Sequence, residues 1–326
     1  MPIVKSNYSP AKLYVNGHIE TIIPALFRNV TGVTYLRERI FTPDDDFLDL
    51  DWMKTHYNSS QESSKKLVII SHGLEGNTSR SYIYGMVKAF HSKGYDVLAW
   101  NFRGCSEEMN KQLRFYHSGD TTDLDIVIEY AAINYDQIFL IGFSLGGNVT
   151  LKYLGEKKKD LNPKIKRAVT FSTPVDLKSS CLEISRPVNW LYSKRFLYSL
   201  KDKVRRKSQM MPEKLSTSHL AKIKNLYQFD DIYTAPIHGF LNADDYYTRS
   251  SAISFLSEIA IETLLVNAVN DPFLPSKCYP NDKDVNNPNL YLEYPEKGGH
   301  CGFPQRINGI LWSENRAIEF IENREV

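Results

Sequence analysis

The sequence predicts an α/β protein in which a mostly parallel central sheet is flanked by helices. Short apolar runs rich in β-branched residues alternate along the chain with segments whose apolar residues have helical spacing. This order is typical of parallel strands joined by helices. Residues 178–240 depart from the alternation and resemble irregular helices inserted between two strands. Because single α/β domains often reach 326 residues, we expect one domain over 1–326 with a helical lid or cap at 178–240.

The individual strands and helices can be placed in chain order. Residues 33–54 contain two segments of alternating polarity, which predict an antiparallel pair of strands at the start of the sheet. The closing helix, at 312–323, is amphipathic and has Ser313 in a position that suits an N-cap. Further strands are expected at 67–73, 96–104, 137–143, 164–176, 261–271 and 289–300, and further helices at 81–94, 123–134 and 148–157.

Composition and charge exclude several kinds of partner. With 40 basic and 38 acidic residues the formal net charge is +2, so no overall field attracts nucleic acid. The four cysteines are widely separated and form no Cys/His cluster at metal-ligand spacing, which argues against a metal site and suits a reducing compartment. The first residues lack the apolar core of a signal peptide, and no run of roughly 18 apolar residues occurs. We therefore expect a cytoplasmic protein with no obligate protein partner.

One segment of the expected lid, residues 186–207, combines four aromatic side chains with a dense set of lysines and arginines. The simpler interpretation is a helix that buries its aromatic residues against the main domain and presents its charges to water. The alternative is a peripheral contact with a membrane surface, or a part in binding an acyl chain.

A candidate nucleophile lies between an expected strand and an expected helix. Residues 142–146 read Gly-Phe-Ser-Leu-Gly and match the G-x-S-x-G motif in the strand–turn–helix context that it requires. A serine on such a tight turn has unfavourable backbone angles, and its neighbours must be small so that strand and helix can approach each other. Gly142, Gly146 and Gly147 meet that need. We expect Ser144 to be a catalytic nucleophile; the alternative is a glycine-rich turn with an inert serine.

A serine nucleophile needs a base to take its proton and a carboxylate to orient that base. Asp271 and His300 follow Ser144 in the order serine, acid, histidine, and each comes after an expected strand. Both should therefore lie at the carboxyl edge of the sheet together with the serine. The competing acid is Asp176, which also follows a strand, and the competing base is His238, which stands out of the expected order.

The tetrahedral intermediate needs two backbone N–H donors for its oxyanion. The residue after the nucleophile, Leu145, supplies the first. The second is expected from the loop SHGLEGN at 71–77, where the amide of Leu74 is the best placed. We interpret His72 as a structural residue that shapes this loop.

Taken together, the motifs resemble those of the α/β-hydrolase superfamily and, more closely, of its YheT-like branch of predicted esterases. The resemblance covers nearly the whole chain and implies a triad of Ser144, Asp271 and His300 without metal or organic cofactor. The family's positions Asn101, Arg103, Tyr116, His117 and Asp245 are also present. For Arg103 and Asp245 the simpler interpretation is that of buried structural partners, and a direct substrate role is the alternative. The resemblance rests on NGHIETI (16–22), HGLEG (72–76), NFRGC (101–105), YHSGDTTDL (116–124), GFSLGGN (142–148), DDYY (244–247), NDPFLP (270–275) and GGHCGF (298–303).

The function expected from the sequence is a serine esterase that forms an acyl-enzyme on Ser144 and acts on small-molecule or lipid esters with short or medium acyl chains. Acyl transfer to an alcohol shares the same intermediate and is the alternative within the enzyme class. A catalytically silent binding protein on a hydrolase scaffold is the alternative outside it.

Overall fold

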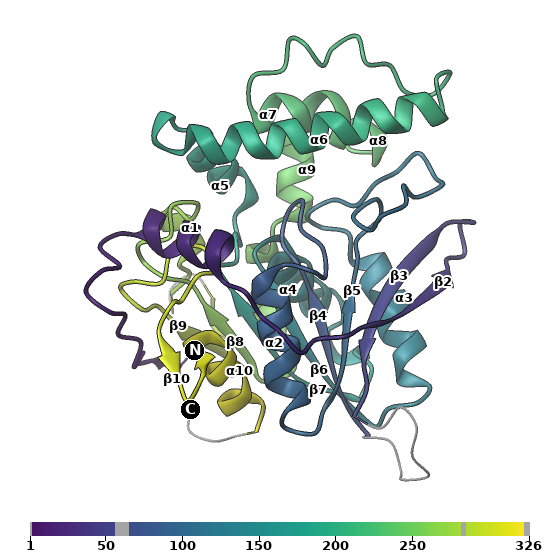
Figure 1. Ribbon diagram of the computed structural model, residues 1–326. Coiled ribbons are helices and arrows are strands. Elements are labelled where there is room, and N and C mark those ends of the chain that lie inside the picture. The colour runs from purple at the N-terminus through teal and green to yellow at the C-terminus, as the bar shows by residue number, and fades with distance from the viewer. Residues whose placement is uncertain (1, 56–64, 282–284, 323–326) are drawn as a thin grey trace.

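The computed structural model describes residues 2–55, 65–281 and 285–322, and its centre is a nine-stranded sheet (Figure 1). The strand order is β1-β9-β8-β7-β6-β4-β5-β3-β2. Strand β3 pairs antiparallel with β2 and with β5, and the other pairings in this sheet are parallel. The strands are β1 (Ile3–Val4), β2 (Leu36–Phe41), β3 (Phe47–Met53), β4 (Lys66–Ser71), β5 (Asp96–Trp100), β6 (Gln137–Phe143), β7 (Ile165–Phe171), β8 (Thr263–Val266) and β9 (Leu290–Glu293).

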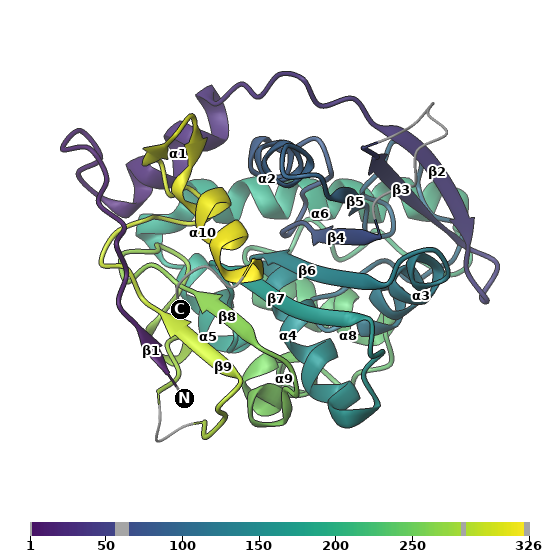
Figure 2. The same ribbon diagram turned by 90° about the horizontal axis from the view of Figure 1, so that it is seen from below.

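Two layers of helices cover the sheet. Helices α2 (Ser81–His91) and α10 (Trp312–Ile321) lie on one face, and α3 (Thr121–Ala132) and α4 (Leu145–Lys157) lie on the other (Figure 2). The central strands are apolar on both faces because both are covered, as parallel strands usually are. This architecture confirms the predicted fold class, a mostly parallel sheet flanked by helices.

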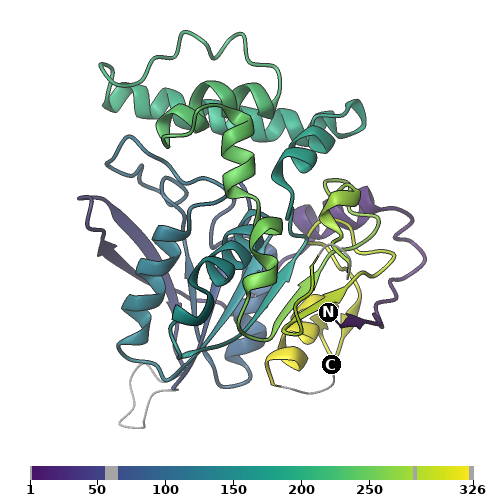
Figure 3. The same cartoon turned by 180° about the vertical axis from the view of Figure 1, so that it is seen from behind.

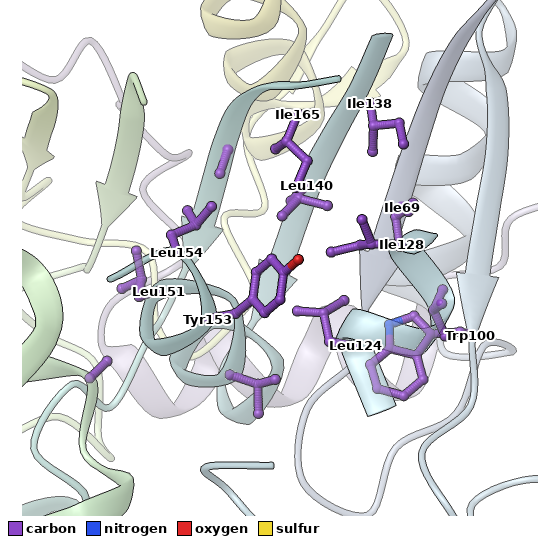
Figure 4. Close-up of a cluster of buried hydrophobic side chains, with 14 of the residues drawn as sticks. Ile69, Trp100, Leu124, Ile128, Ile138, Leu140, Leu151, Tyr153, Leu154 and Ile165 are labelled. Atoms are coloured by element: carbon purple, nitrogen blue, oxygen red, sulfur yellow. The ribbon is translucent and has the colours of Figure 1, made fainter. Parts of the chain in front are cut away.

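The side of the sheet under α3 and α4 holds the larger hydrophobic core. Leucine and isoleucine side chains from both helices interlock with those of β4, β6 and β7 (Figure 4). Burial of each such side chain stabilises the fold by roughly 1.5–3 kcal/mol. The labelled members are Ile69, Trp100, Leu124, Ile128, Ile138, Leu140, Leu151, Tyr153, Leu154 and Ile165.

A group of helices between β7 and β8 lies above the carboxyl edge of the sheet (Figures 1 and 3), and we call it the cap. The cap has a hydrophobic core of its own, which includes Leu197, Val204, Phe229 and Tyr233. A π-helical turn, Asp230–Thr234, follows α7, and a 3-10 segment, Ala252–Glu258, follows α9. The cap helices are α5 (Leu177–Ile184), α6 (Trp190–Met210), α7 (Leu226–Phe229), α8 (Ala235–Ile237) and α9 (Ala243–Ser250).

Three local features differ from the sequence-based expectations or extend them. The closing helix begins after Leu311, so Ser313 lies inside it; the prediction of Ser313 as N-cap was wrong. The side chain of Glu314 instead accepts the backbone N–H of Leu311 at 2.9 Å. Strand β1, which pairs with β9, and helix α1 (Gly17–Phe27) are additions to the elements expected from the sequence. A short ribbon of β10 (Arg306–Ile307) and β11 (Ile310–Leu311) precedes the closing helix.

Candidate active site

Ser144 occupies the tight turn between β6 and α4 with φ 53° and ψ −119°. A φ in this range is strained for a residue with a side chain. A Cβ placed on Gly142 would lie 2.6 Å from the Cα of Gly147, and one on Gly146 would lie 2.4 Å from the carbonyl oxygen of Ser71. The glycines around Ser144 are therefore needed for the close approach of strand and helix.

The structure brings Ser144, His300 and Asp271 into one chain of hydrogen bonds. His300 Nε2 lies 2.9 Å from Ser144 Oγ, and His300 Nδ1 lies 2.8 Å from Asp271 Oδ2. Asp271 Oδ1 also accepts the backbone N–H of Phe273 at 2.8 Å. Burial alone would lower the pKa of His300, but the negative charge of Asp271 outweighs it and raises that pKa above its usual range. This geometry suits a serine whose proton passes to an oriented imidazole.

The two competing residues lie in other hydrogen-bonded arrangements. Asp176 is the N-cap of α5, and its carboxylate accepts the backbone N–H of Ser179 at 2.8 Å. His238 Nδ1 contacts the carbonyl oxygen of Thr234 at 2.7 Å in the cap. Neither contacts Ser144 or His300 among the described residues, so the geometry favours Asp271 and His300.

Helix α1 braces the loop that carries His300, which explains the motif NGHIETI. The hydroxyl of Thr21 accepts the backbone N–H of His300 at 2.8 Å. The buried carboxylate of Glu20 accepts the N–H of Gly298 at 3.1 Å and the side-chain N–H of Asn270 at 2.6 Å. The positioning role of Glu20 and Thr21 could not be predicted from the sequence, because their partners lie more than 200 positions away along the chain.

The loop after β4 places Leu74 in the wall of the cavity that contains Ser144. The N–H of Gly73 donates to the hydroxyl of Tyr82 at 3.0 Å, and the N–H of Glu75 donates to the hydroxyl of Tyr116 at 2.9 Å. Within the described ranges no acceptor is found for the amides of Leu74 and Leu145. Both residues line the cavity that contains Ser144, so the two amides are available as donors.

A buried ion pair ties this loop to the cap. Lys203 of α6 lies 2.7 Å from Glu75 Oε1, and both side chains are nearly inaccessible to water. The hydroxyls of Tyr116, at 2.7 Å, and Ser199 donate to the same carboxylate. Burial alone would raise the pKa of Glu75, but Lys203 and these donors hold it below its usual range. Since Glu75 has φ 53°, these contacts stabilise a strained residue next to Leu74.

The cavity above Ser144 has a volume of about 100 Å³ and lies between the sheet edge and the cap. Its walls include apolar side chains such as Leu177, Phe196 and Leu200. The cap also contributes a carboxyl group, Asp230, which accepts hydrogen bonds of 2.6 Å from both Tyr247 and Thr234. The pKa of Asp230 is raised to about 6, because burial disfavours its charged form more than these bonds favour it.

Three further family positions, Arg103, Asp245 and His117, lie in different surroundings. Arg103 is buried and pairs with Asp123 at 2.7 Å and with Asp46 at 2.8 Å, which agrees with a structural role. Asp245 is only half-buried, so the expectation of a buried partner was wrong: it lies in the first turn of α9, accepts the N–H of Leu241 at 3.0 Å and pairs with the exposed Arg249 at 3.3 Å. The ring of His117 packs 4.8 Å from that of His238, and burial holds the pKa of His117 well below its usual range. His117 lines the cavity, whereas Arg103 and Asp245 do not.

Comparison with known proteins places the chain in a family. Residues 66–306 match the model of the alpha/beta hydrolase fold, and the chain belongs to this family. The candidate esterase YheT of Escherichia coli (strain K12) is 32% identical over 97% of this chain and 93% of its own. A Bos taurus protein named phospholipase ABHD3 is 30% identical over 94% of this chain and 75% of its own. These names agree with the expectation of an ester-hydrolysing enzyme.

The fold also resembles that of a solved esterase. The Pyrococcus furiosus esterase Pf2001 superimposes with a TM-score of 0.57 at 19% identity, over 99% of this chain and 98% of that one. Within the described part of the chain, no helix is both long and apolar enough to cross a membrane, and no group of three or more potential metal ligands occurs.

Proposed function

We propose that the protein is a serine carboxylesterase in which Ser144 forms the acyl-enzyme. The observation that carries this proposal is the chain of hydrogen bonds from Ser144 Oγ through His300 to Asp271 at the base of a largely apolar cavity. Membership of the α/β-hydrolase family supports it, because relatives of the chain are named for ester hydrolysis.

In the acylation step, Ser144 Oγ attacks the ester carbonyl carbon while His300 Nε2 accepts the hydroxyl proton. Asp271 holds His300 with Nε2 toward the serine and stabilises the imidazolium. The negative charge on the carbonyl oxygen is met by the amides of Leu74 and Leu145. The tetrahedral intermediate collapses when the bond to the alcohol oxygen breaks, and His300 gives its proton to that oxygen.

In the deacylation step, water takes the place of the departed alcohol and attacks the acyl carbon. His300 accepts a proton from this water, the bond to Ser144 Oγ breaks, and the proton returns to the serine. The products are a carboxylic acid and the free enzyme. No metal or organic cofactor enters these steps.

The cavity supports a preference for short acyl chains. Its volume of about 100 Å³ is smaller than the roughly 150 Å³ of an engineered cavity that holds benzene. A long acyl chain would require the cap to move. We therefore propose that the cap acts as a lid whose α5 and α6 side chains limit the acyl length.

The experiment is hydrolysis of p-nitrophenyl esters from acetate to palmitate by the wild type and Ser144→Ala. We expect kcat/KM to be highest for a short acyl chain and to fall by about four to six orders of magnitude in the variant, which keeps only the oxyanion donors and substrate binding. Ser179→Ala is the matched control, because this serine lies outside the cavity.

A loss of kcat/KM of less than tenfold in Ser144→Ala would contradict the assignment of Ser144 as the nucleophile. Wild-type activity confined to assays with an added acceptor alcohol would turn the assignment from hydrolysis to acyl transfer. If neither assay showed turnover that depends on Ser144, the remaining interpretation would be a catalytically silent binding protein on a hydrolase scaffold.

A further inference from the structure

Positive charge is concentrated in the outer layer of the cap. Residues 186–224 hold 11 of the chain's 40 lysines and arginines but only 2 of its 38 acidic residues. Most of this stretch is α6 and the segment after it, which form the layer farthest from the sheet (Figures 1 and 3). Because the whole chain carries only +2, this stretch is strongly positive and the rest of the chain has a net negative charge.

Helix α6 has an inner and an outer face. Phe196 and Leu200 on the inner face line the cavity that contains Ser144, and Leu197 and Val204 pack into the core of the cap. The side chains that point to solvent recur at helical spacing. Together with the turn before α6 they form the outer face: Val188, Trp190, Leu191, Lys194, Arg195, Tyr198, Arg205 and Arg206.

The charges on the outer face are free to meet an external partner. Among the described residues, no ion pair involves Lys194, Arg195, Arg205 or Arg206. Within α6 itself the acidic side chain is that of Asp202. An unneutralised row of basic side chains on one helix face attracts an anionic surface.

The same face exposes large apolar side chains at its amino-terminal end. Val188, Trp190 and Leu191 are 62%, 55% and 60% exposed, and Tyr198 is 73% exposed. Contiguous exposed apolar side chains mark an interaction surface. Tryptophan and tyrosine are favoured where a protein meets the boundary between lipid headgroups and acyl chains.

We propose that the outer face of α6 docks the protein on an anionic lipid surface. The basic side chains would contact headgroup phosphates, while Trp190, Leu191 and Val188 enter the boundary with the acyl chains. A nucleic acid would meet the charges equally well but would leave Val188 and Leu191 without an apolar environment, so the composition of the face favours lipid.

Docking in this orientation places the lipid next to the cavity. Helix α6 separates the two, and a helix with its side chains is about 10 Å across. At its amino-terminal end the ring of Tyr192 lies 4.7 Å from that of Phe273, which in turn lies 4.3 Å from the ring of His300. Insertion of the outer face into lipid would therefore shift the amino-terminal end of α6, whose Tyr192 contacts His300 through Phe273.

The test is co-sedimentation with vesicles of phosphatidylcholine, with and without phosphatidylglycerol. We expect binding that requires phosphatidylglycerol and weakens at high salt. Replacement of Lys194, Arg195, Arg205 and Arg206 by Gln should lower the partition coefficient roughly 600-fold, since each of the four basic side chains contributes about fivefold near an anionic surface. Trp190→Ala should lower it on the order of tenfold.

Two matched controls distinguish docking through the outer face from an effect of removing positive charge or an exposed apolar side chain anywhere on the protein. Lys65, Lys93, Lys159 and Lys166 are exposed near the opposite, amino edge of the sheet, and their replacement by Gln should leave binding unchanged. Ile133→Ala removes an apolar side chain that is 75% exposed at the C-cap of α3. Hydrolysis of a soluble p-nitrophenyl ester should be unaffected in all these variants, because none of the replaced side chains lines the cavity.

The docking proposal is independent of the proposed reaction, so Ser144→Ala should bind vesicles as the wild type does. Equal binding to neutral and anionic vesicles, an equal loss in the control variants, or no binding at all would overturn the proposal. Binding of a DNA duplex by the outer face without binding of vesicles would likewise overturn it and assign the face to nucleic acid.

Discussion

At the sheet edge, Ser144, Asp271 and His300 stand on turns that follow β6, β8 and β9, whereas the opposite wall of the cavity is built from the helices of the cap. The edge is held by backbone contacts: glycines that admit no side chain, and N–H groups that bond to Thr21 and Glu20. The cap is held by side-chain packing and by buried charges such as Glu75 with Lys203. The proposed reaction therefore depends on the geometry of the sheet edge, and the proposed selection of substrate depends on the cap.

The largest effect is expected from the acid at the edge. Asp271→Asn should lower kcat by about 10⁴-fold, because an amide no longer holds His300 in the correct tautomer. Asp176→Asn is the matched control and should leave turnover and stability nearly unchanged, because Asn caps a helix about as well as Asp. Steady-state kinetics of both variants measures the difference, and a greater loss of turnover in Asp176→Asn would contradict the assignment of the acid.

The next effect tests the link between the edge and the cap. Lys203→Met should destabilise the protein by about 3–5 kcal/mol, because it leaves the carboxylate of Glu75 buried without its cation. It should also lower kcat more than it changes KM, since Glu75 adjoins the proposed oxyanion donor Leu74. Urea unfolding measures the stability, with the exposed Lys194→Met as control. If adding Glu75→Gln to Lys203→Met recovered no stability, the buried charge would not be the cause.

A third effect belongs to the cap alone. The pKa of Asp230 is raised to about 6, so its protonated form is the more favourable in the folded state, and the charged form costs stability as the pH rises from about 4 through 6. Asp230→Asn should therefore stabilise the protein on the order of 2 kcal/mol at pH 8 and much less at pH 4. Thermal unfolding at both values measures this, with Asp202→Asn on α6 as control. Destabilisation at pH 8 would mean that the charged form is needed for folding.

The smallest effect is a shift in the pH profile. Because His300 must be neutral to accept the proton of Ser144 and its pKa is raised, the acid limb of kcat/KM should have its midpoint above the ordinary histidine value of about 6.5. The residual activity of Asp271→Asn should show this limb at lower pH, since the charge that stabilises the imidazolium is gone. An unchanged midpoint in Asp271→Asn would show that the acid limb does not report the titration of His300 beside Asp271.

The residues of the sheet edge could be predicted from the sequence because their signals are local or ordered along the chain. A serine among glycines after an apolar run defines a tight turn, and the order of Ser144, Asp271 and His300 follows from the order of the parallel strands. Leu74 was predicted from the loop that follows β4, where the structure leaves its amide available. The fold class followed from alternation alone.

Contacts between distant segments could not be predicted in the same way. Glu20 and Thr21 brace a loop almost 280 residues later, and Lys203 finds Glu75 across the cap. Each of these contacts depends on how the cap and α1 pack against the carboxyl edge of the sheet. The spacing of residues along the chain does not reveal this packing. Ser313 failed as N-cap for a similar reason: the backbone carbonyl of Gln305 accepts the N–H of Trp312, and the N-cap is Leu311, two residues before Ser313.

The measurement that tests the central proposal most directly is covalent labelling with a fluorophosphonate, followed by mass spectrometry of the peptides. An activated serine reacts with this probe far faster than an ordinary one. We predict one label, on the peptide that contains Ser144, its loss in Ser144→Ala, and slower labelling while a short-chain ester is present in excess. A label on another serine of the cavity, such as Ser118 or Ser180, or no label on a folded wild-type protein, would contradict the account.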